Sequence, residues 1–291
     1  MKKLLILSGK GGTGKTTVAG AFIKLSNCDR FADCDVDAPN LHLITNIKDY
    51  SCVKSEYTGG KIAEIDANVC VGCGLCYDHC RFGAIERRSD GKYSVLQYSC
   101  EGCGVCTLVC PCGAVKFNDD VCGELFKYSG ENKVFSTAEL KMGKGNSGKL
   151  VTEVKEQLKG ASVGNSNLQI VDGSPGIGCP VIASISGMDI VLIVAEPSVS
   201  GFSDLERLYK TVIISCTRMA VCVNKYDISI EKTEKIKEFC LQKEIPFVGE
   251  IPYDETVMTA LENGQSVIEY DCPASKSIKD VYSNIIKYIY S

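Results

Sequence analysis

The sequence predicts an α/β fold, in which a mostly parallel sheet is flanked by helices and a small α+β domain is inserted into the chain. Short apolar runs alternate with segments of helical periodicity along much of the 291 residues, as is typical of parallel sheets. A glycine-rich loop at residues 9–16 separates the first apolar run from the first helical segment. A cysteine-rich stretch at residues 70–110 then interrupts the alternation.

The elements of the larger domain follow from the positions of the apolar residues. Continuous apolar runs indicate strands buried on both faces, and apolar residues three or four positions apart indicate helices. The last helix carries an apolar stripe that predicts core packing, with an amphipathic membrane-binding helix as the alternative. We expect strands at residues 3–8, 168–172, 189–195 and 219–224, another strand that ends near residue 35, and helices at 16–26, 202–214, 230–243 and 275–290.

The glycine-rich loop has the form G-x4-G-K-T and lies between a strand and a helix. In that position, backbone N–H groups and the dipole of the following helix cradle phosphates. Lys15 is placed to contact the β- and γ-phosphates, and the Thr16 hydroxyl is placed to hold Mg²⁺. The predicted nucleotide-binding residues of the loop are Gly9, Lys10, Gly11, Gly12, Thr13, Gly14, Lys15, Thr16 and Thr17.

A second lysine, Lys10, directly follows the first glycine of the loop. With it, the loop resembles the deviant Walker A motif of the MinD/ParA and nitrogenase iron-protein superfamily. The resemblance implies a Mg²⁺-dependent ATPase that forms a homodimer when ATP binds. It also implies that Lys10 reaches across the dimer interface to the nucleotide of the partner subunit. The alternative is a solvated loop lysine.

Two acidic segments resemble the switch regions of the same superfamily. Phe31–Asn40 resembles switch I, which implies that Asp35 lies near Mg²⁺ and that Asp37 orients the attacking water. An apolar run that ends at Asp172 resembles Walker B and leads into a segment that resembles switch II. By this match Asp172 holds Mg²⁺ through water, and the Gly176 N–H senses the γ-phosphate. An aspartate after a strand can also be a helix cap or a turn residue.

The residues that bind the base are expected at the end of a later strand. Val221–Asp227 resembles the base-recognition strand of the superfamily, which implies that Asn224 bonds to the adenine edge. The same letters fit N-K-x-D, the guanine signature of GTPases, with Asp227 as the guanine-binding residue. Because MinD-type proteins with this motif use ATP, we expect ATP. The loop that contains Pro252 resembles the family's loop over the base. The catalytic residues implied by the resemblance are Lys10, Lys15 and Asp37.

The cysteine-rich stretch contains the pattern C-x2-C-x2-C-x3-C twice. This spacing supplies the ligands of [4Fe–4S] clusters, and in two-cluster ferredoxins the fourth cysteine of each run ligates the other cluster. Structural zinc and disulfides are alternatives, but zinc usually takes two separated C-x2-C pairs. We therefore assign one cluster to Cys70, Cys73, Cys76 and Cys110, and a second cluster to Cys100, Cys103, Cys106 and Cys80.

The domain organisation follows from the order of the motifs. Residues 61–118 resemble bacterial dicluster ferredoxins and separate the two halves of the nucleotide motifs. We expect a discontinuous P-loop domain, residues 1–60 and 119–291, with the ferredoxin-like domain inserted into a surface connection where extra length costs little. Tyr57–Gly60 is the expected entry linker, and the exit is expected near Asn118.

Composition excludes several classes of partner. The net charge is −4 and the chain has no long basic run, so nucleic acid is not an expected partner. No apolar stretch reaches the length that spans a membrane, and the N-terminal apolar run is a core strand rather than a signal peptide. Eighteen cysteines could form disulfides, but a P-loop enzyme with iron–sulfur clusters belongs in a reducing cytoplasm. Since oxygen destroys exposed clusters, we expect an anaerobic organism.

The combined motifs support two main hypotheses. The first is an ATP-hydrolysing protein in which a nucleotide-dependent change of the dimer controls electron transfer through two [4Fe–4S] clusters to a redox partner. The alternative is a carrier or scaffold that delivers clusters or another metallocofactor to a target protein. Spatial positioning of a complex, as by MinD and ParA, is a third idea.

Cys179 follows Asp172 at the offset of a cluster ligand in the nitrogenase iron protein, which implies that it faces the dimer partner or the inserted clusters. A buried turn cysteine is the alternative.

Overall fold

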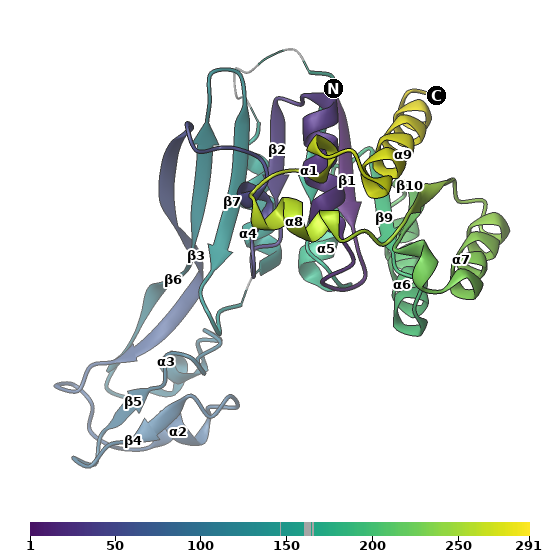
Figure 1. Ribbon diagram of the computed structural model, residues 1–291. Coiled ribbons are helices and arrows are strands. Elements are labelled where there is room, and N and C mark those ends of the chain that lie inside the picture. The colour runs from purple at the N-terminus through teal and green to yellow at the C-terminus, as the bar shows by residue number, and fades with distance from the viewer. Residues whose placement is uncertain (146, 160–163, 165) are drawn as a thin grey trace. The chain divides into compact units, whose positions relative to one another are not determined.

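The structure is a computed structural model, which describes residues 1–145, 147–159, 164 and 166–291. Across these residues, nine strands form one sheet in the order β11-β10-β9-β1-β8-β2-β7-β6-β3 (Figure 1). Its strands are β1 (Lys2–Leu7), β2 (Arg30–Asp33), β3 (Ser51–Ile65), β6 (Val115–Ser129), β7 (Val134–Leu140), β8 (Leu168–Asp172), β9 (Ile190–Ala195), β10 (Arg218–Asn224) and β11 (Phe247–Ile251). A separate antiparallel pair consists of β4 (Ile85–Arg87) and β5 (Tyr93–Val95).

The sheet is mostly parallel, as the alternation of elements predicted. Every pairing from β11 through to β7 is parallel, and β1 lies between β8 and β9, with Leu5 opposite Val171 and Val191. Strands β8 and β9 are buried along their whole length, which is why their sequences are continuous apolar runs instead of alternating ones. The carboxyl ends of β1, β2 and β8 therefore meet at one edge, where ligands bind in such sheets.

Helices flank this sheet, and the longer ones are α1 (Lys15–Ser26), α4 (Ser147–Glu156), α5 (Cys179–Ile185), α6 (Val199–Ile214), α7 (Ile230–Gln242), α8 (Thr256–Glu262) and α9 (Pro273–Tyr290). Four of them, α1, α6, α7 and α9, lie where the helical periodicity predicted, with small shifts at their ends, whereas α4, α5 and α8 were not predicted. Short helices are α2 (Leu75–Asp78) and α3 (Val105–Val109), and 3-10 turns occur at η1 (Leu41–Leu43), η2 (Tyr226–Ile228) and η3 (Val267–Glu269).

The main hydrophobic core joins β1 to helices α1 and α9. Leu4 and Ile6, alternate residues of β1, pack in this cluster with the apolar stripe of α9. Ile278, Val281 and Ile285 of that stripe are at most 1% exposed, so the stripe packs in the core, as its periodicity predicted. Among the described residues, no helix is both long and apolar enough to cross a membrane.

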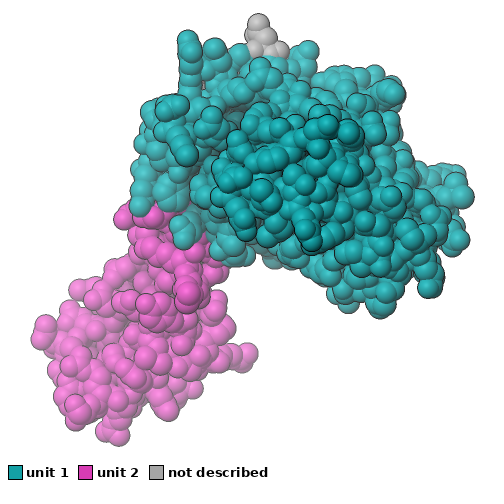
Figure 2. Space-filling model, in the orientation of Figure 1, with its two compact units in different colours: residues 1–54, 125–139, 147–291 teal, residues 55–124, 140–146 magenta. Residues whose placement is uncertain are grey.

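The chain divides into two compact units, shown in different colours in Figure 2. Unit 1 comprises residues 1–54, 125–139 and 147–291, and unit 2 comprises residues 55–124 and 140–146. Strand β3 begins in unit 1 and ends in unit 2, and β6 begins in unit 2 and ends in unit 1. Strand β7 likewise begins in unit 1 and ends in unit 2 at Leu140, so the backbone passes between the units within three strands.

These strands correct the predicted linkers. Tyr57–Gly60 lies inside β3, and Asn118 lies inside β6. The paired glycines suggested a turn, but Gly59 serves a close approach between strands. A Cβ atom at this position would lie 2.9 Å from Cys122 Sγ on β6. A glycine in a strand often marks such an approach, which the sequence alone does not distinguish from a turn.

Candidate functional site

The glycine-rich loop connects β1 to α1, and the helix begins at Lys15. Gly14 precedes the helix with φ 91°, a conformation that favours glycine, and a Cβ atom there would lie 2.2 Å from Asn224 Nδ2. Asn224 donates its side-chain amide to the Thr13 carbonyl oxygen at 2.7 Å. A cavity of about 540 Å³ opens over the loop, within the usual range for small-molecule sites. The loop residues that line it are Lys10, Gly11, Gly12, Thr13, Gly14, Lys15, Thr16 and Thr17.

Lys15 is buried beneath the cavity and pairs with Asp172 at the end of β8, with 2.6 Å between Nζ and Oδ1. Burial on its own would lower the pKa of Lys15, but the carboxylates of Asp172, Asp33 and Asp35 hold that pKa above its usual value. The lysine therefore keeps its charge. The structure thus brings together the loop lysine and the Walker B aspartate that the sequence singled out separately.

A further buried carboxylate, Asp33 at the end of β2, was not among the predicted site residues. It accepts backbone N–H bonds from Asp35 at 3.0 Å and from Asn40 and Leu41 at 2.9 Å each. Burial, followed by the charge of Asp172, raises the pKa of Asp33 to about 7. Asp33 begins a run of three aspartates at alternate positions, which is the signal that could have identified it.

Of the two predicted site aspartates that follow β2, Asp35 and Asp37, only Asp35 lines the cavity. Burial raises the pKa of Asp35, whereas Asp37 is exposed and lies outside the lining. Gly176 also lies outside it, and its N–H donates to the Ser8 carbonyl oxygen at 3.0 Å. This N–H has to leave Ser8 before it can meet a phosphate.

The polar groups under the cavity fit a hard divalent cation. Asp172 Oδ2 is buried and has no hydrogen-bond partner among the described residues. The carboxyls of Asp33, Asp35 and Asp172 outnumber the one buried cation, Lys15. Carboxylate, hydroxyl and phosphate oxygens are the ligands that Mg²⁺ takes, and the Thr16 side chain lines the same space.

Part of the cavity lining forms an apolar wall, which was missed by sequence reasoning. Asn224 lines the cavity too, but Asp227 does not, and the Asp227 carboxylate accepts the Tyr253 N–H at 2.8 Å. Pro252 lies outside the lining as well. The apolar side chains of the wall are Ile251, Val257, Met258, Leu261 and Ile278. An apolar surface of this kind suits the flat face of a nucleotide base.

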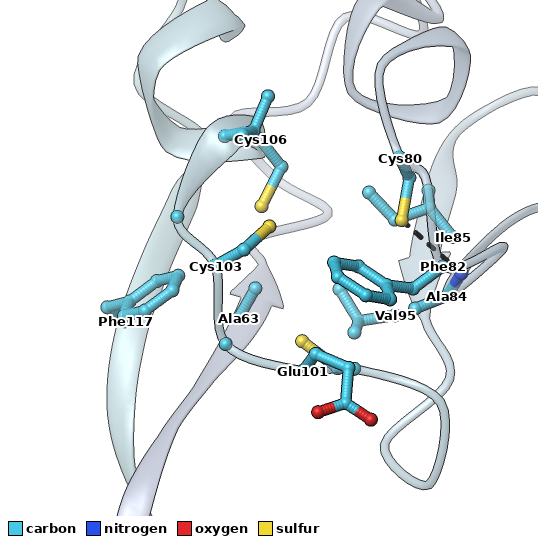
Figure 3. Close-up of a pocket in the computed structure, with 14 residues that line it drawn as sticks. Ala63, Cys80, Phe82, Ala84, Ile85, Val95, Glu101, Cys103, Cys106 and Phe117 are labelled. Atoms are coloured by element: carbon cyan, nitrogen blue, oxygen red, sulfur yellow. Dashed lines mark hydrogen bonds between the residues drawn. The ribbon is translucent and has the colours of Figure 1, made fainter.

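In unit 2, one cavity collects cysteines from both repeats. Cys80, Cys103 and Cys106 point their sulfur atoms into a common space (Figure 3). Cys100 completes the set of four cysteines that line this cavity. The rest of the lining is largely apolar and includes Ala63, Phe82, Ala84, Ile85, Val95, Val105 and Phe117. Three cysteines of one run and the fourth cysteine of the other run thus share one cavity.

The second cavity of unit 2 shows the reciprocal arrangement. Cys70, Cys73 and Cys76 of the first run line it together with Cys110 of the second run. A fifth cysteine, Cys112, lines the same cavity and was not predicted to take part. The sequence analysis had assigned the fourth cysteine of each run to the site formed by the other run. The two cavities group the cysteines in this way.

The fourth cysteine of each run has the same backbone environment. The Ala84 N–H donates to Cys80 Sγ at 3.3 Å, and the Ala114 N–H donates to Cys110 Sγ at 3.3 Å. Hydrogen bonds to cysteine sulfur are among the factors that set the potential of an iron–sulfur cluster. The two repeats are therefore alike in local geometry as well as in sequence.

Burial also changes the acidity of two thiols in unit 2. Burial, together with neighbouring cysteines, raises the pKa of Cys76 and of Cys106. A metal reverses such a shift, because thiols bind as thiolates. All eighteen cysteines of the sequence fall within the described residues, and each is a free thiol. Disulfides therefore do not account for the repeats.

Across the residues that the structure describes, no group of three or more His, Cys, Asp or Glu side chains could hold a single metal ion. A four-iron cluster makes a different demand, since each of its thiolates binds a separate iron at a separate corner. Two cavities that each bring at least four cysteines around a space fit this demand better than they fit a structural zinc.

Comparison with known proteins decides the family. Residues 4–267 match the CobQ/CobB/MinD/ParA nucleotide-binding domain. The chain belongs to this family. Its parallel sheet and glycine-rich loop are accordingly those of a MinD/ParA-type nucleotide-binding protein.

Relatives of similar length are found in an archaeon. The chain is 32% identical to an uncharacterized protein of Methanocaldococcus jannaschii over 99% of its own length and 97% of that protein. A second uncharacterized protein of the same organism is 27% identical over 93% of each chain. The septum site-determining protein MinD of Helicobacter pylori is 28% identical, over 40% of this chain and 48% of that one.

Solved structures of the family share the fold. MinD from Pyrococcus horikoshii, complexed with Mg-ADP, has a TM-score of 0.58 at 16% identity and covers 99% of this chain and 96% of its own. The Cyanothece McdA(D38A)–ATP complex has a TM-score of 0.56 at 19% identity, covering 98% of this chain and 96% of its own. At these identities the likeness concerns the fold alone.

In this MinD/ParA-type chain, Lys10 pairs with Glu196 at 2.7 Å between Nζ and Oε2 and contacts Ser200 Oγ at 3.3 Å. Its side chain is 38% exposed, so the pair lies near the surface. Gly9 packs closely on α6, and a Cβ atom there would lie 2.1 Å from Asp204 Cβ. This contact, and not the phosphate cavity, is what requires a glycine at this position.

Cys179 begins α5 and is exposed. The interpretation as a buried turn cysteine is therefore wrong. Its predicted position, facing a partner subunit or the inserted clusters, stays a prediction.

Proposed function

We propose that the protein is a Mg²⁺-dependent ATPase that controls electron transfer through two [4Fe–4S] clusters held by unit 2. The observation that carries the iron–sulfur part is the pair of cysteine cavities. Each cavity is lined by the first three cysteines of one run and the fourth cysteine of the other. This exchange of the fourth ligand is the arrangement of two-cluster ferredoxins. When bound, such clusters accept and release single electrons.

The buried charges of unit 1 support the ATPase part. Lys15 would leave Asp172 to contact the β- and γ-phosphates, and Asp172 with Thr16 would then hold Mg²⁺. Because Asp35 lines the cavity and Asp37 does not, we assign to Asp35 the orientation of the attacking water. Catalysis of this kind depends mainly on positioning and on stabilisation of charge.

ATP is the preferred nucleotide in this proposal. Asn224 lines the cavity together with the apolar side chains, within reach of a base edge, whereas Asp227 lies outside the lining and its carboxylate is engaged by Tyr253. A guanine-binding site would need the Asp227 carboxylate free to accept the N–H groups of the base.

A homodimer that closes on ATP completes the proposal, as the family resemblance implies. Lys10 is held at the surface by a pair with Glu196, from which it can be released to a nucleotide on the partner subunit. The strands offer a physical connection to the clusters. β2, which ends at Asp33, is paired with β7, and β7 neighbours β6, which continues into unit 2.

The decisive experiment measures cluster reduction in protein purified without oxygen. The wild type is expected to hold about eight iron atoms per chain, and Mg-ATP is expected to change by at least about fivefold the rate at which reduced methyl viologen reduces them, an effect on the order of 1 kcal/mol. Lys10→Ala should abolish the ATP effect and leave the iron content unchanged. Lys48→Ala removes an exposed lysine outside the cavity and serves as the matched control.

Two results would separate the alternatives. Protein that contains iron but shows no ATP effect, and that passes its clusters to an apo-ferredoxin, is a carrier. Protein purified without iron contradicts the electron-transfer function outright.

A further inference from the structure

The two cysteine repeats differ in the residue that stands two positions after the fourth cysteine and lines a cavity. After the fourth cysteine, the first repeat continues Cys80-Arg81-Phe82-Gly83-Ala84 and the second continues Cys110-Pro111-Cys112-Gly113-Ala114. Phe82 and Cys112 therefore occupy equivalent places. Phe82 lines the cavity that holds the first three cysteines of the second run, and Cys112 lines the cavity that holds the first three cysteines of the first run. One cavity thus has four cysteines in its lining, and the other has five.

The extra cysteine lies directly beside a predicted ligand. Cys112 Sγ is 3.7 Å from Cys110 Sγ, a distance at which either thiol can donate to the other. Both side chains are half-buried. The two sulfur atoms approach the cavity from the same short segment, so either can reach the same corner of a bound group. Phe82 offers no such atom to the other cavity.

We infer that Cys112 is a reserve ligand, able to replace Cys110 on the iron atom that Cys110 holds. This inference rests on the proposed function, because it presupposes a cluster in that cavity. The exchange is a substitution and not a redox step. The Cys110 sulfur–iron bond breaks, a Cys112 sulfur–iron bond forms, and the proton of the Cys112 thiol passes to the Cys110 sulfur. No oxidant or reductant is needed, and the total charge is conserved.

The backbone gives the same support to both fourth cysteines. Cys110 Sγ accepts the Ala114 N–H at 3.3 Å, and Cys80 Sγ accepts the Ala84 N–H at 3.3 Å. The difference lies two residues further on, where the second repeat has the thiol of Cys112 and the first has the ring of Phe82. The prediction is therefore an asymmetry. The cluster held through Cys110 survives loss of that ligand, and the cluster held through Cys80 does not.

The test compares alanine variants of the two fourth ligands, purified without oxygen from the full chain. Cys80→Ala should lose about one to four iron atoms of the wild-type eight, and a loss of one should leave the paramagnetic signal of an oxidised three-iron cluster. Cys110→Ala should keep about eight iron atoms and show no such signal. Adding Cys112→Ala to Cys110→Ala should reproduce the iron loss seen in Cys80→Ala.

A gain of function provides the second arm of the test. Phe82→Cys introduced into Cys80→Ala should restore the missing iron, since it recreates in the first repeat what Cys112 supplies in the second. If Cys110→Ala loses as much iron as Cys80→Ala while the wild type is fully loaded, the reserve ligand is wrong and the proposed function stands. A wild type without iron overturns the proposed function itself.

Discussion

The two units of the chain differ in what fills their interiors. Unit 1 has a large cluster of aliphatic and aromatic side chains, and even its buried charges are paired internally, as in Lys15 with Asp172. Unit 2 has little of this kind. Within residues 61–118, all of which are described, the only buried side chains larger than cysteine are Ile85, Tyr93 and Val115. Small domains with so little core usually require disulfides or metals to fold.

Under the proposed function, the two units draw on different sources of stability. The interior of unit 1 is an apolar cluster with a buried ion pair, Lys15 with Asp172. Unit 2 gathers cysteines where a core would be, so bound clusters would serve as its core and would contribute directly to its folding free energy.

The largest expected effect comes from removing the iron. Anaerobic chelation should unfold residues 61–118 and leave unit 1 folded, because only unit 2 depends on the clusters for its core. Hydrogen exchange read peptide by peptide should show loss of protection in β4 and β5, with β8 and β9 unchanged. Full protection of both units after iron removal would show that unit 2 does not depend on bound clusters for its core.

The second effect concerns the buried ion pair of unit 1. Lys15→Met should reduce ATP hydrolysis by about a thousandfold or more, because the phosphates lose their main positive charge. It should also lower the free energy of unfolding by about 3–5 kcal/mol, since Asp172 is left buried without its cation. Adding Asp172→Asn should recover much of the stability but none of the activity. An unchanged urea midpoint in Lys15→Met would show that the buried Asp172 does not need the charge of Lys15 for stability.

A smaller effect is expected at the base. Asn224→Ala should weaken ATP binding about tenfold, as expected for the loss of one or two hydrogen bonds, one of them to the phosphate loop. Asp227→Ala, its neighbour outside the cavity, should leave the preference for ATP over GTP unchanged. Titration calorimetry with both nucleotides provides the measurement. A loss of GTP binding in Asp227→Ala would instead assign the site to guanine.

The last effect is a pH dependence confined to unit 1. The pKa of Asp33 rises from 3.8 to about 7 on folding. The folded chain therefore binds more protons than the unfolded chain between these values, and its free energy of unfolding falls as the pH rises through that window. Asp33→Asn should flatten this slope by on the order of 1 kcal/mol per pH unit.

The measurement is urea unfolding between pH 5 and 8, followed by pulsed hydrogen exchange of β8. Asp37→Asn, which changes an exposed aspartate of the same segment, should keep the wild-type slope. Equal slopes in the wild type and in Asp33→Asn would remove Asp33 as the cause.

Much of the fold was predictable because its signals are local. The apolar runs of β8 and β9 and the glycine-rich loop before α1 each identify themselves within a few residues. The cysteine spacing likewise predicted which thiols meet, because three positions in one tight turn must take their fourth partner from elsewhere. The strand through Tyr57–Gly60 was mistaken for a linker, since a glycine pair favours turns and close strand approaches alike.

By itself, the sequence determined the strands β1, β2, β8, β9 and β10, the helices α1, α6, α7 and α9, the phosphate loop and the two sets of cysteines, all of which depend on short-range spacing. Only the tertiary structure decided that Asp33 lies near Asp172 and Lys15, and that α8 supplies an apolar wall of the nucleotide cavity. It also decided that Cys112 lies beside Cys110 in the cavity lined by the first three cysteines of the first run. The physical reason is that burial and pairing between distant segments depend on how strands stack and loops close, and no local pattern encodes those distances.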